Sequence, residues 1–295
     1  MNILVTTATF DATGFPEGLN VVYNPVGRRL NEEEIFRLVL EYQPAGILAG
    51  VEPLTRRVME AARGLKVVSR CGIGLDSVDL EAAKDLGIKV TNTPDAPTDS
   101  VAELTLGMIL CLLRRITVMD ASLKQGVWKD AGGFMLKDKT VGVVGGGRIG
   151  TAVARLLLAF GCNVIGYDPY LKSHSLMELM PLDGLVAASD VVTLHIPHTK
   201  ETHHLIDGRR LGLMKPGALL INAARGGVVD EAPLYDALAG GRLGGAALDC
   251  FEEEPYSGPL TGLNNVILTP HVGSAAFESR VNMEREAMRN LLANL

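Results

Sequence analysis

The sequence predicts an α/β fold with two doubly wound parallel-sheet domains, and three observations support this class. Short apolar runs alternate with helical patterns, a glycine-rich turn lies near the middle of the 295 residues, and 47% hydrophobic content suffices for two packed cores. The net charge of −6 and the lack of a dense Lys/Arg cluster argue against nucleic acid or an anionic membrane surface as the main partner.

Strand-like apolar runs alternate with helical patterns in both halves of the chain. We expect strands at residues 3–6, 20–23, 46–49, 66–69 and 88–91, with helices at 32–42, 55–63 and 79–86. The alternation resumes with strand-like runs at 191–196, 218–222, 245–248 and 265–268. Because β-α alternation is typical of parallel sheets, the sequence predicts two such sheets.

A proline-containing stretch at residues 94–103 separates the two groups of strands and begins a long apolar helix, expected to reach about Ile116. Ser100 and Glu103 have the spacing of a capping box for this helix. Residues 277–295 form a helical pattern with no strand after it, so we expect them to pack back on an existing sheet. The predicted domains are therefore residues 1–94 plus 274–295, and residues 95–273.

The glycine-rich run TVGVVGGGRIG at residues 140–150 joins a buried strand to a helix at 148–160. In such a turn Gly145 allows the reversal, Gly147 lets a pyrophosphate approach the backbone, and Gly150 lets the helix pack closely on its strand. The helix N-terminus then faces the phosphates. The run predicts a Rossmann-type dinucleotide site.

An acidic residue, Asp168, follows the next strand-like run and lies 18 residues beyond Gly150. This is close to the spacing expected for the carboxylate that holds the adenosine ribose. The carboxylate favours NAD because it would repel the 2′-phosphate of NADP, although Lys172 lies nearby.

Three polar residues follow strands of the second group, at the carboxyl ends where open parallel sheets bind ligands. Arg225 follows the run at 219–222, Glu254 follows the run at 245–248, and His271 follows the run at 265–268. An arginine grips a carboxylate through two parallel hydrogen bonds, and a carboxylate-oriented imidazole exchanges a proton with a carbonyl oxygen. The trio predicts hydride transfer between a nicotinamide and a 2-oxo or 2-hydroxy acid.

Four spaced motifs give the chain a resemblance to the D-isomer-specific 2-hydroxyacid dehydrogenases, nearest to their phosphoglycerate dehydrogenase branch. Besides the glycine turn, these are residues 222–230, residues 246–255 (AALDCFEEEP) and residues 269–273 (TPHVG). The resemblance implies a flavodoxin-like substrate domain beside the Rossmann NAD-binding domain, and a homodimer. It implies that Arg225 binds substrate, Glu254 partners the histidine and His271 is the acid/base.

The resemblance also implies which residues contact the ligands. Asp249 is expected to face the nicotinamide amide, and residues 69–74 (SRCGIG) resemble a turn whose amides hold the substrate carboxylate, with a plain glycine turn as the alternative interpretation. The expected NAD contacts are Gly145, Gly147, Arg148, Ile149, Gly150, Asp168, Ala223, Arg225, Asp249, His271 and Ser274. The expected substrate contacts are Arg70, Gly72, Ile73, Gly74, Arg225 and His271.

The identity of the substrate stays open, because two stretches depart from the phosphoglycerate enzymes of the animal type. Residues 48–52 (LAGVE) and 128–134 (WKDAGGF) lack the arginine and the basic cluster expected there. Arg70 and Lys129 remain as phosphate partners, but one or two charges hold a dianion less well than a cluster. Phosphoglycerate is therefore one candidate beside the substrates of a glyoxylate or hydroxypyruvate reductase.

The other motifs favour structural explanations. His195, His198, His203 and His204 bunch together without the carboxylate and cysteine partners of a metal site, so no metal is expected. Cys250 is interpreted as a small packing residue. Scattered cysteines, no basic leader and short apolar stretches predict a cytoplasmic, unprocessed protein without membrane contact. The regulatory domain of longer phosphoglycerate enzymes is not expected after residue 295.

Two functions of different classes are compatible with these features. The first is an NAD-dependent dehydrogenase of a small D-2-hydroxy acid, which needs Arg225, Glu254 and His271. The second is an NAD(H)-sensing binding protein, similar to the corepressor relatives of the family, which needs no catalytic trio. Retention of the trio favours the enzyme. Formate dehydrogenase relatives are disfavoured because they are expected to carry glutamine in place of Glu254.

Overall fold

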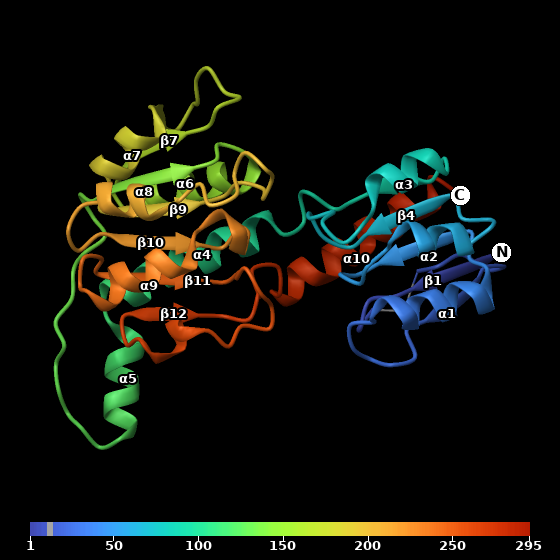
Figure 1. Cartoon of the computed structure of the whole chain (residues 1–295), viewed down its shortest axis with the longest axis horizontal. Helices are drawn as coiled ribbons and strands as arrows, with labels where there is room; N and C mark the ends of the chain where they lie inside the picture. The colour runs from blue at the N-terminus through green and yellow to red at the C-terminus, as the bar shows by residue number, and fades with distance from the viewer. Residues whose placement is uncertain (11–13) are drawn as a thin grey trace. The chain divides into compact units, whose positions relative to one another are not determined.

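The computed structural model describes residues 1–10 and 14–295, and the chain divides into two compact units. Met1–Pro97 and Ser274–Leu295 belong to the first unit, and Thr98–Gly273 form the second (Figure 1). The sequence placed the boundaries after residues 94 and 273. The assignment of substrate binding to one domain and NAD binding to the other stays a prediction.

The first unit is built on a parallel sheet of five strands in the order β2-β1-β3-β4-β5, the flavodoxin-like order expected from the resemblance. Each expected strand is present to within one residue. The strands are β1 (Asn2–Val5), β2 (Asn20–Tyr23), β3 (Gly46–Ala49), β4 (Val67–Arg70) and β5 (Lys89–Thr91). The helices are α1 (Glu32–Tyr42), α2 (Arg56–Ala61), α3 (Leu80–Asp85) and α10 (Phe277–Leu292).

Helices cover both faces of this sheet, because alternate side chains of each strand point to opposite sides. Leu4 of β1 packs with buried residues of α1, α2 and α3, whereas Ile3 and Val5 pack with Ala287 and Leu291 of α10. The C-terminal helix therefore packs back on the existing sheet, as predicted.

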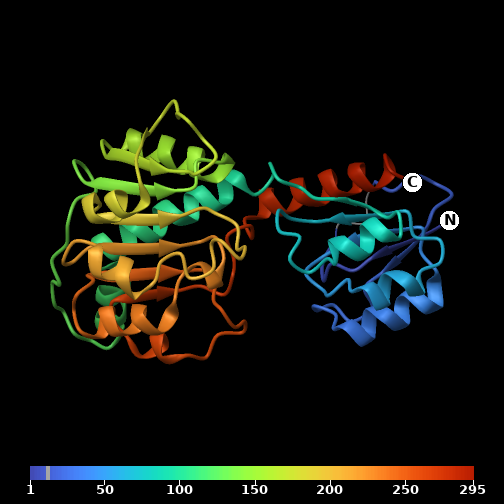
Figure 2. The same ribbon diagram turned by 45° about the horizontal axis from the view of Figure 1, so that its top comes forward.

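The second unit is built on a parallel sheet of seven strands in the order β12-β11-β10-β9-β6-β7-β8. Figure 2 shows these strands side by side with helices on both sides. The strands are β6 (Thr140–Val144), β7 (Asn163–Tyr167), β8 (Glu178–Leu179), β9 (Val191–Leu194), β10 (Leu219–Asn222), β11 (Gly245–Leu248) and β12 (Val266–Leu268). The helical segments are α4 (Thr98–Leu113), α5 (Ile116–Lys124), α6 (Arg148–Ala159), α7 (Leu182–Ala188), α8 (Gly208–Leu213), α9 (Glu231–Ala239), η1 (Gly226–Val228) and η2 (Pro259–Gly262).

The order of the strands creates a switch point beside β6. The chain moves from β6 to β7 and β8 on one side, then returns to β9 on the other, which is the Rossmann pattern with a seventh strand added. Strand β9 shows how the core forms: Val191 faces α4 and α6, while Val192 and Leu194 face α7, α8 and α9. The predicted class of two doubly wound parallel sheets is confirmed.

The long apolar helix differs from its prediction at both ends. Helix α4 begins at Thr98, so Ser100 lies inside it, and the predicted capping box is wrong. The Ser100 hydroxyl donates instead to the carbonyl oxygen of Gly273, at 2.7 Å. The helix ends at Leu113 because Arg115 adopts a left-handed conformation with φ 51°, after which α5 begins. Within the described residues, no helix is long and apolar enough to cross a bilayer.

Candidate active site

The glycine turn between β6 and α6 fits a dinucleotide cradle. Gly145 has φ 103°, and a side chain there would overlap the carbonyl oxygen of His195 at the end of β9. A side chain on Gly150 would overlap the carbonyl oxygen of Gly145, so the helix packs directly on the turn. Gly147, the N-cap of α6, is exposed and has no atom within 4 Å of the position of a side chain. The turn thus offers an open approach to the backbone at a helix N-terminus.

Asp168 lies beside this turn, at the carboxyl end of β7. Its Oδ2 atom accepts a hydrogen bond of 2.9 Å from the Gly146 amide, and its Oδ1 atom accepts one of 2.9 Å from the Tyr170 amide. Each carboxylate oxygen has a further lone pair for a ribose hydroxyl. Of the neighbouring predicted contacts, Arg148 is exposed and Ile149 is half-buried against the core.

A histidine and a glutamate form the central pair of the candidate site. Both carboxylate oxygens of Glu254 contact Nδ1 of His271, at 2.9 and 3.1 Å, and the two side chains are 35% and 45% exposed. The Phe251 amide donates to Oε1 of Glu254 at 3.1 Å, which fixes the carboxylate. His271 itself has φ 54°, a left-handed conformation that costs free energy in a residue other than glycine.

Arg225 is connected to the region of Glu254 and His271 by hydrogen bonds among residues at the ends of β10 and β11. The side chain of Asn222 donates to the Arg225 carbonyl oxygen at 2.9 Å and accepts from the Ala224 amide at 3.1 Å. Nη1 of Arg225 donates to the Ala224 carbonyl oxygen at 2.7 Å, and the Cys250 thiol donates to the same oxygen at 3.4 Å.

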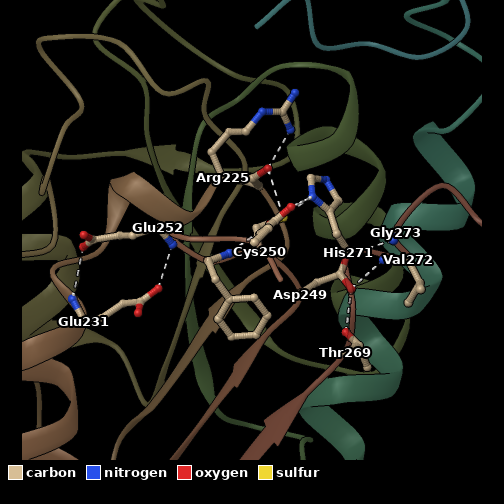
Figure 3. A network of polar contacts seen from close by, with 12 residues as sticks. Arg225, Glu231, Asp249, Cys250, Glu252, Thr269, His271, Val272 and Gly273 are labelled. Carbon is tan, nitrogen blue, oxygen red and sulfur yellow. Dashed lines mark hydrogen bonds and ion pairs between the residues drawn. The ribbon is translucent and has the colours of Figure 1, made fainter. Parts of the chain in front are cut away.

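The thiol of Cys250 completes the connection, because it lies within 4.8 Å of donor atoms of Glu254 and His271. Arg225, Glu254 and His271 therefore belong to one network built from the carboxyl ends of β10, β11 and β12. Figure 3 shows Arg225, Cys250 and His271 of this network. Gly226 is required in this region, since a side chain would overlap the backbone of Phe251.

The carboxylate of Asp249 is buried, with 1% of the residue exposed. It accepts hydrogen bonds from the Thr269 hydroxyl at 2.5 Å and from the amides of Val272 and Gly273 at 2.8 and 2.7 Å. These contacts hold the segment that carries His271, and a contact of Asp249 with the nicotinamide stays a prediction. The expected NAD contacts of Ala223, which is buried after β10, and of Ser274, which belongs to the first unit, also stay predictions.

The predicted substrate turn at residues 69–74 lies in the first unit, after β4. Gly72 has φ 138°, and its amide already donates to the Thr93 hydroxyl at 2.7 Å. The guanidinium of Arg70 donates to the carbonyl oxygen of Cys71, and the carbonyl oxygen of Ile73 accepts from Asn92 at 2.7 Å. The Gly72 amide is thus engaged within the turn, and substrate binding by Arg70, Gly72, Ile73 and Gly74 stays a prediction.

The histidines that follow β9 contact one another, and one of them also contacts two carboxylates. Nε2 of His198 contacts Nδ1 of His203 at 3.1 Å, and the rings of His203 and His204 stack at 3.9 Å. His204 contacts Glu252 at 2.9 Å and Asp230 at 3.7 Å. The expectation that these histidines lack carboxylate partners is therefore wrong for His204, because the fold brings Asp230 and Glu252 to it from distant segments.

The sequence of this chain is similar to a protein-family model and to several known proteins. Residues 106–273 match the family model described as D-isomer specific 2-hydroxyacid dehydrogenase, NAD binding domain. The D-3-phosphoglycerate dehydrogenase of Methanocaldococcus jannaschii is 43% identical over 263 residues, which are 86% of this chain and 50% of that protein. This chain therefore spans about half the length of that relative.

Two further matches extend over nearly the whole of the other protein. The hydroxypyruvate reductase of Thermotoga maritima is 38% identical over 273 residues, 90% of this chain and 89% of that protein. The structure of D-lactate dehydrogenase from Aquifex aeolicus, complexed with NAD and lactic acid, superimposes with a TM-score of 0.84 at 30% identity, covering 99% of this chain and 95% of that one.

Proposed function

The chain belongs to the D-isomer specific 2-hydroxyacid dehydrogenase family, and from this we propose that it interconverts a small D-2-hydroxy acid and its 2-oxo acid with NAD. The proposal rests on the contact between Glu254 and His271. This pair belongs to one network with Arg225, and it follows strands of the same sheet that carries the glycine turn. A bound NAD supplies the nicotinamide carbon that gives or takes the hydride.

Each member of the trio has a distinct task in this reaction. Because Glu254 holds Nδ1 of His271, Nε2 is the ring nitrogen that gives a proton to the substrate carbonyl oxygen in reduction and takes it back in oxidation. The guanidinium of Arg225 binds the substrate carboxylate and polarises the neighbouring carbonyl group.

The proposed preference for NAD over NADP depends on Asp168. Two backbone amides fix its carboxylate beside the glycine turn, where the 2′-phosphate of NADP would meet a negative charge. Lys172 is exposed in the loop after β7 and is the neighbouring cation that would oppose this preference.

The proposed substrate is an unphosphorylated 2-oxo acid such as glyoxylate or hydroxypyruvate. After β3, where phosphoglycerate enzymes of the animal type are expected to carry an arginine, Glu52 is 1% exposed and accepts hydrogen bonds from the Thr6 hydroxyl and the Gly50 amide. A buried carboxylate at the end of this strand disfavours a dianion there. The 2-oxo group and carboxylate common to these substrates are all that the trio requires.

We also propose a homodimer, with a second copy of the chain covering α5. This helix has no buried residue, and Figure 1 shows it extending beyond the sheet of its unit. Together with the segment that follows, it leaves large apolar side chains exposed, among them Trp128 at 92%. Such a patch marks a protein interface. The exposed residues are Ile116, Leu123, Val127, Trp128, Phe134 and Met135.

A cytoplasmic location belongs to the same proposal. All four cysteines lie in the described part of the chain, and all are free thiols. Free thiols are typical of proteins kept in a reducing compartment.

The test is an NADH-oxidation assay with glyoxylate, hydroxypyruvate, phosphohydroxypyruvate and pyruvate, repeated with NADPH. We expect turnover of at least one unphosphorylated acid with NADH, and slower turnover with NADPH. In the His271→Asn variant, kcat should fall by about a hundredfold or more while the Kd for NADH, followed by its fluorescence, stays within about twofold.

Two results would contradict the proposal. NADH binding without turnover of any of the four acids favours the NAD(H)-sensing protein, whose function lies in partner contacts. Unchanged turnover in His271→Asn would remove His271 from the role of acid/base.

A further inference from the structure

Cys250 brings a third kind of donor atom to the pair formed by Glu254 and His271. The Cys250 sulfur, a Glu254 oxygen and a His271 ring nitrogen all lie within 4.8 Å of one another. The residue is 2% exposed, and its thiol points to the same Ala224 carbonyl oxygen that accepts from Arg225. Sulfur, oxygen and nitrogen donors thus converge beside the candidate acid/base.

We propose that Cys250, Glu254 and His271 form a zinc-binding site whose occupation blocks the proposed reaction. Thiolate, imidazole and carboxylate are the ligands that Zn²⁺ takes in proteins, and three protein ligands leave a fourth position for water. With the usual zinc bond lengths, tetrahedral donors lie roughly 3.4 Å apart. Because the His271 side chain is 45% exposed, a small rotation of its ring toward the sulfur and the carboxylate brings the present spacing to this value. Magnesium and calcium prefer oxygen ligands and do not suit this set.

The surroundings of the three residues hold the donors in place. The Phe251 amide donates to Oε1 of Glu254 at 3.1 Å, so the carboxylate is fixed before a metal arrives. The buried Asp249 carboxylate fixes the backbone on either side of His271 through Thr269, Val272 and Gly273. Such outer contacts orient metal ligands and raise metal affinity.

A second group of potential ligands, His204, Asp230 and Glu252, contains no sulfur. Its histidine already contacts one carboxylate through each ring nitrogen, Glu252 at Nε2 and Asp230 at Nδ1. The donor set of the Cys250 group is therefore the better match to zinc, and the sulfur gives it a spectroscopic signature that the His204 group lacks.

Zinc binding needs no oxidant or reductant. The Zn–S bond forms as the Cys250 thiol proton leaves to solvent. The proton shared by Glu254 and Nδ1 of His271 moves to Nε2, or to solvent where Nε2 already carries one, and two bonds to the metal replace that hydrogen bond. With Nδ1 bound to zinc, the neutral ring carries its one proton on Nε2 and has no free lone pair to take up another, so His271 no longer alternates between its two protonation states. Inhibition in both reaction directions follows, and this consequence alone rests on the proposed function.

The experiment uses the purified full chain, freed of metal and titrated with Co²⁺ and Zn²⁺. Cobalt reports sulfur ligation through an intense thiolate-to-metal charge-transfer band in the near ultraviolet. We expect this band in the parent protein, its loss in Cys250→Ser, and its retention in the matched controls Cys111→Ser and His204→Gln. Competition with a chromophoric chelator should show that the zinc Kd rises by more than about a hundredfold in Cys250→Ser, above the roughly ten- to hundredfold loss typical of an outer-shell change.

A second variant guards against a folding defect in Cys250→Ser. In His271→Asn the sulfur remains, so the cobalt band should persist with weakened affinity. A cobalt spectrum without the sulfur band in the parent protein overturns the site, as does an unchanged zinc Kd in Cys250→Ser.

Failure of the site and failure of the proposed function give different results. A sulfur-to-cobalt band in a protein that turns over no 2-oxo acid supports the site and contradicts the function. Turnover that zinc does not inhibit, measured relative to each variant's own metal-free rate, contradicts the site and leaves the function intact.

Discussion

The buried carboxylate of Asp249 accepts a hydrogen bond of 2.7 Å from the backbone amide of Gly273. Its other oxygen accepts from the Val272 amide and from the hydroxyl of Thr269, so contacts with Asp249 lie on both sides of His271 in the chain. Because His271 has a left-handed backbone, it needs surroundings that hold it in this conformation. Asp249 is thus a positioning residue for the proposed acid/base.

Replacing Asp249 by asparagine should lower kcat more than it weakens cofactor binding. The amide group has one acceptor oxygen in place of two, so at least one buried donor loses its partner, at a cost of about 1–3 kcal/mol. We expect a kcat reduced about tenfold or more and a lower Tm. The exposed neighbour Glu253→Gln is the matched control. A lower Tm with unaltered kcat would reduce the role of Asp249 to stability.

Replacing Glu254 by glutamine tests the partner of His271 directly. The neutral amide can still accept a hydrogen bond from Nδ1 but places no negative charge beside the ring that exchanges the proton, so reduction should slow by about ten- to a hundredfold. NADH binding, measured by fluorescence, should stay within about twofold of the parent. Equal losses in kcat and in NADH affinity would show a general disruption of the site and count against this specific role.

The turn and the trio were predictable because their determinants are local or follow from sheet geometry. Gly145, Gly147 and Gly150 lie within six residues. The structure requires glycine at positions 145 and 150 because of close backbone approaches, whereas the need for Gly147 comes from the expected pyrophosphate. Glu254 and His271 are far apart in sequence, but carboxyl ends of parallel strands share one edge of a sheet. Their contact therefore follows once the strands are identified.

Other features depend on tertiary contacts that no local pattern contains. Ser100 has the spacing of a capping residue, but its hydroxyl finds the Gly273 carbonyl oxygen and the helix begins earlier. The carboxylate partners of His204 come from segments on either side of α9, 26 and 48 residues away. These partners become visible only when the sheet brings distant loops together.

Replacing Gly147 by alanine should separate cofactor binding from folding. The space around this position is empty and its φ of −73° is ordinary, so the folded structure accommodates a methyl group. A pyrophosphate approaching the helix N-terminus would meet that methyl group. We expect an unchanged Tm and a Kd for NADH raised about tenfold or more.

The control for this substitution is Gly107→Ala, on the exposed face of α4 with equally open surroundings. It should raise the Tm slightly, since alanine favours a helix over glycine, and leave the Kd unchanged. Equal NADH affinity in Gly147→Ala and the parent would show that no phosphate approaches the backbone there.

His195, which directly follows β9, should make the free energy of unfolding depend on pH. Nδ1 of His195 is buried without a hydrogen-bond partner among the described residues, while Nε2 contacts the Thr193 hydroxyl at 2.9 Å. Burial lowers the pKa of His195 to about 3. In the unfolded chain a histidine has a pKa of about 6.5, so between these two values the unfolded state binds a proton that the folded state does not.

Stability should therefore fall as the pH drops below about 6.5, by at most about 1.4 kcal/mol per pH unit from this residue. Glutamine at position 195 keeps a donor for Thr193 but does not titrate. Urea unfolding at pH 7 and pH 5 should show a smaller loss of unfolding free energy in His195→Gln than in the parent. The comparison stops at pH 5 because the carboxylates of Asp183 and Glu34, whose pKa values arginine partners lower to about 2, add losses of the same sign at lower pH. An equal pH slope in both proteins would mean that His195 is protonated in the folded state.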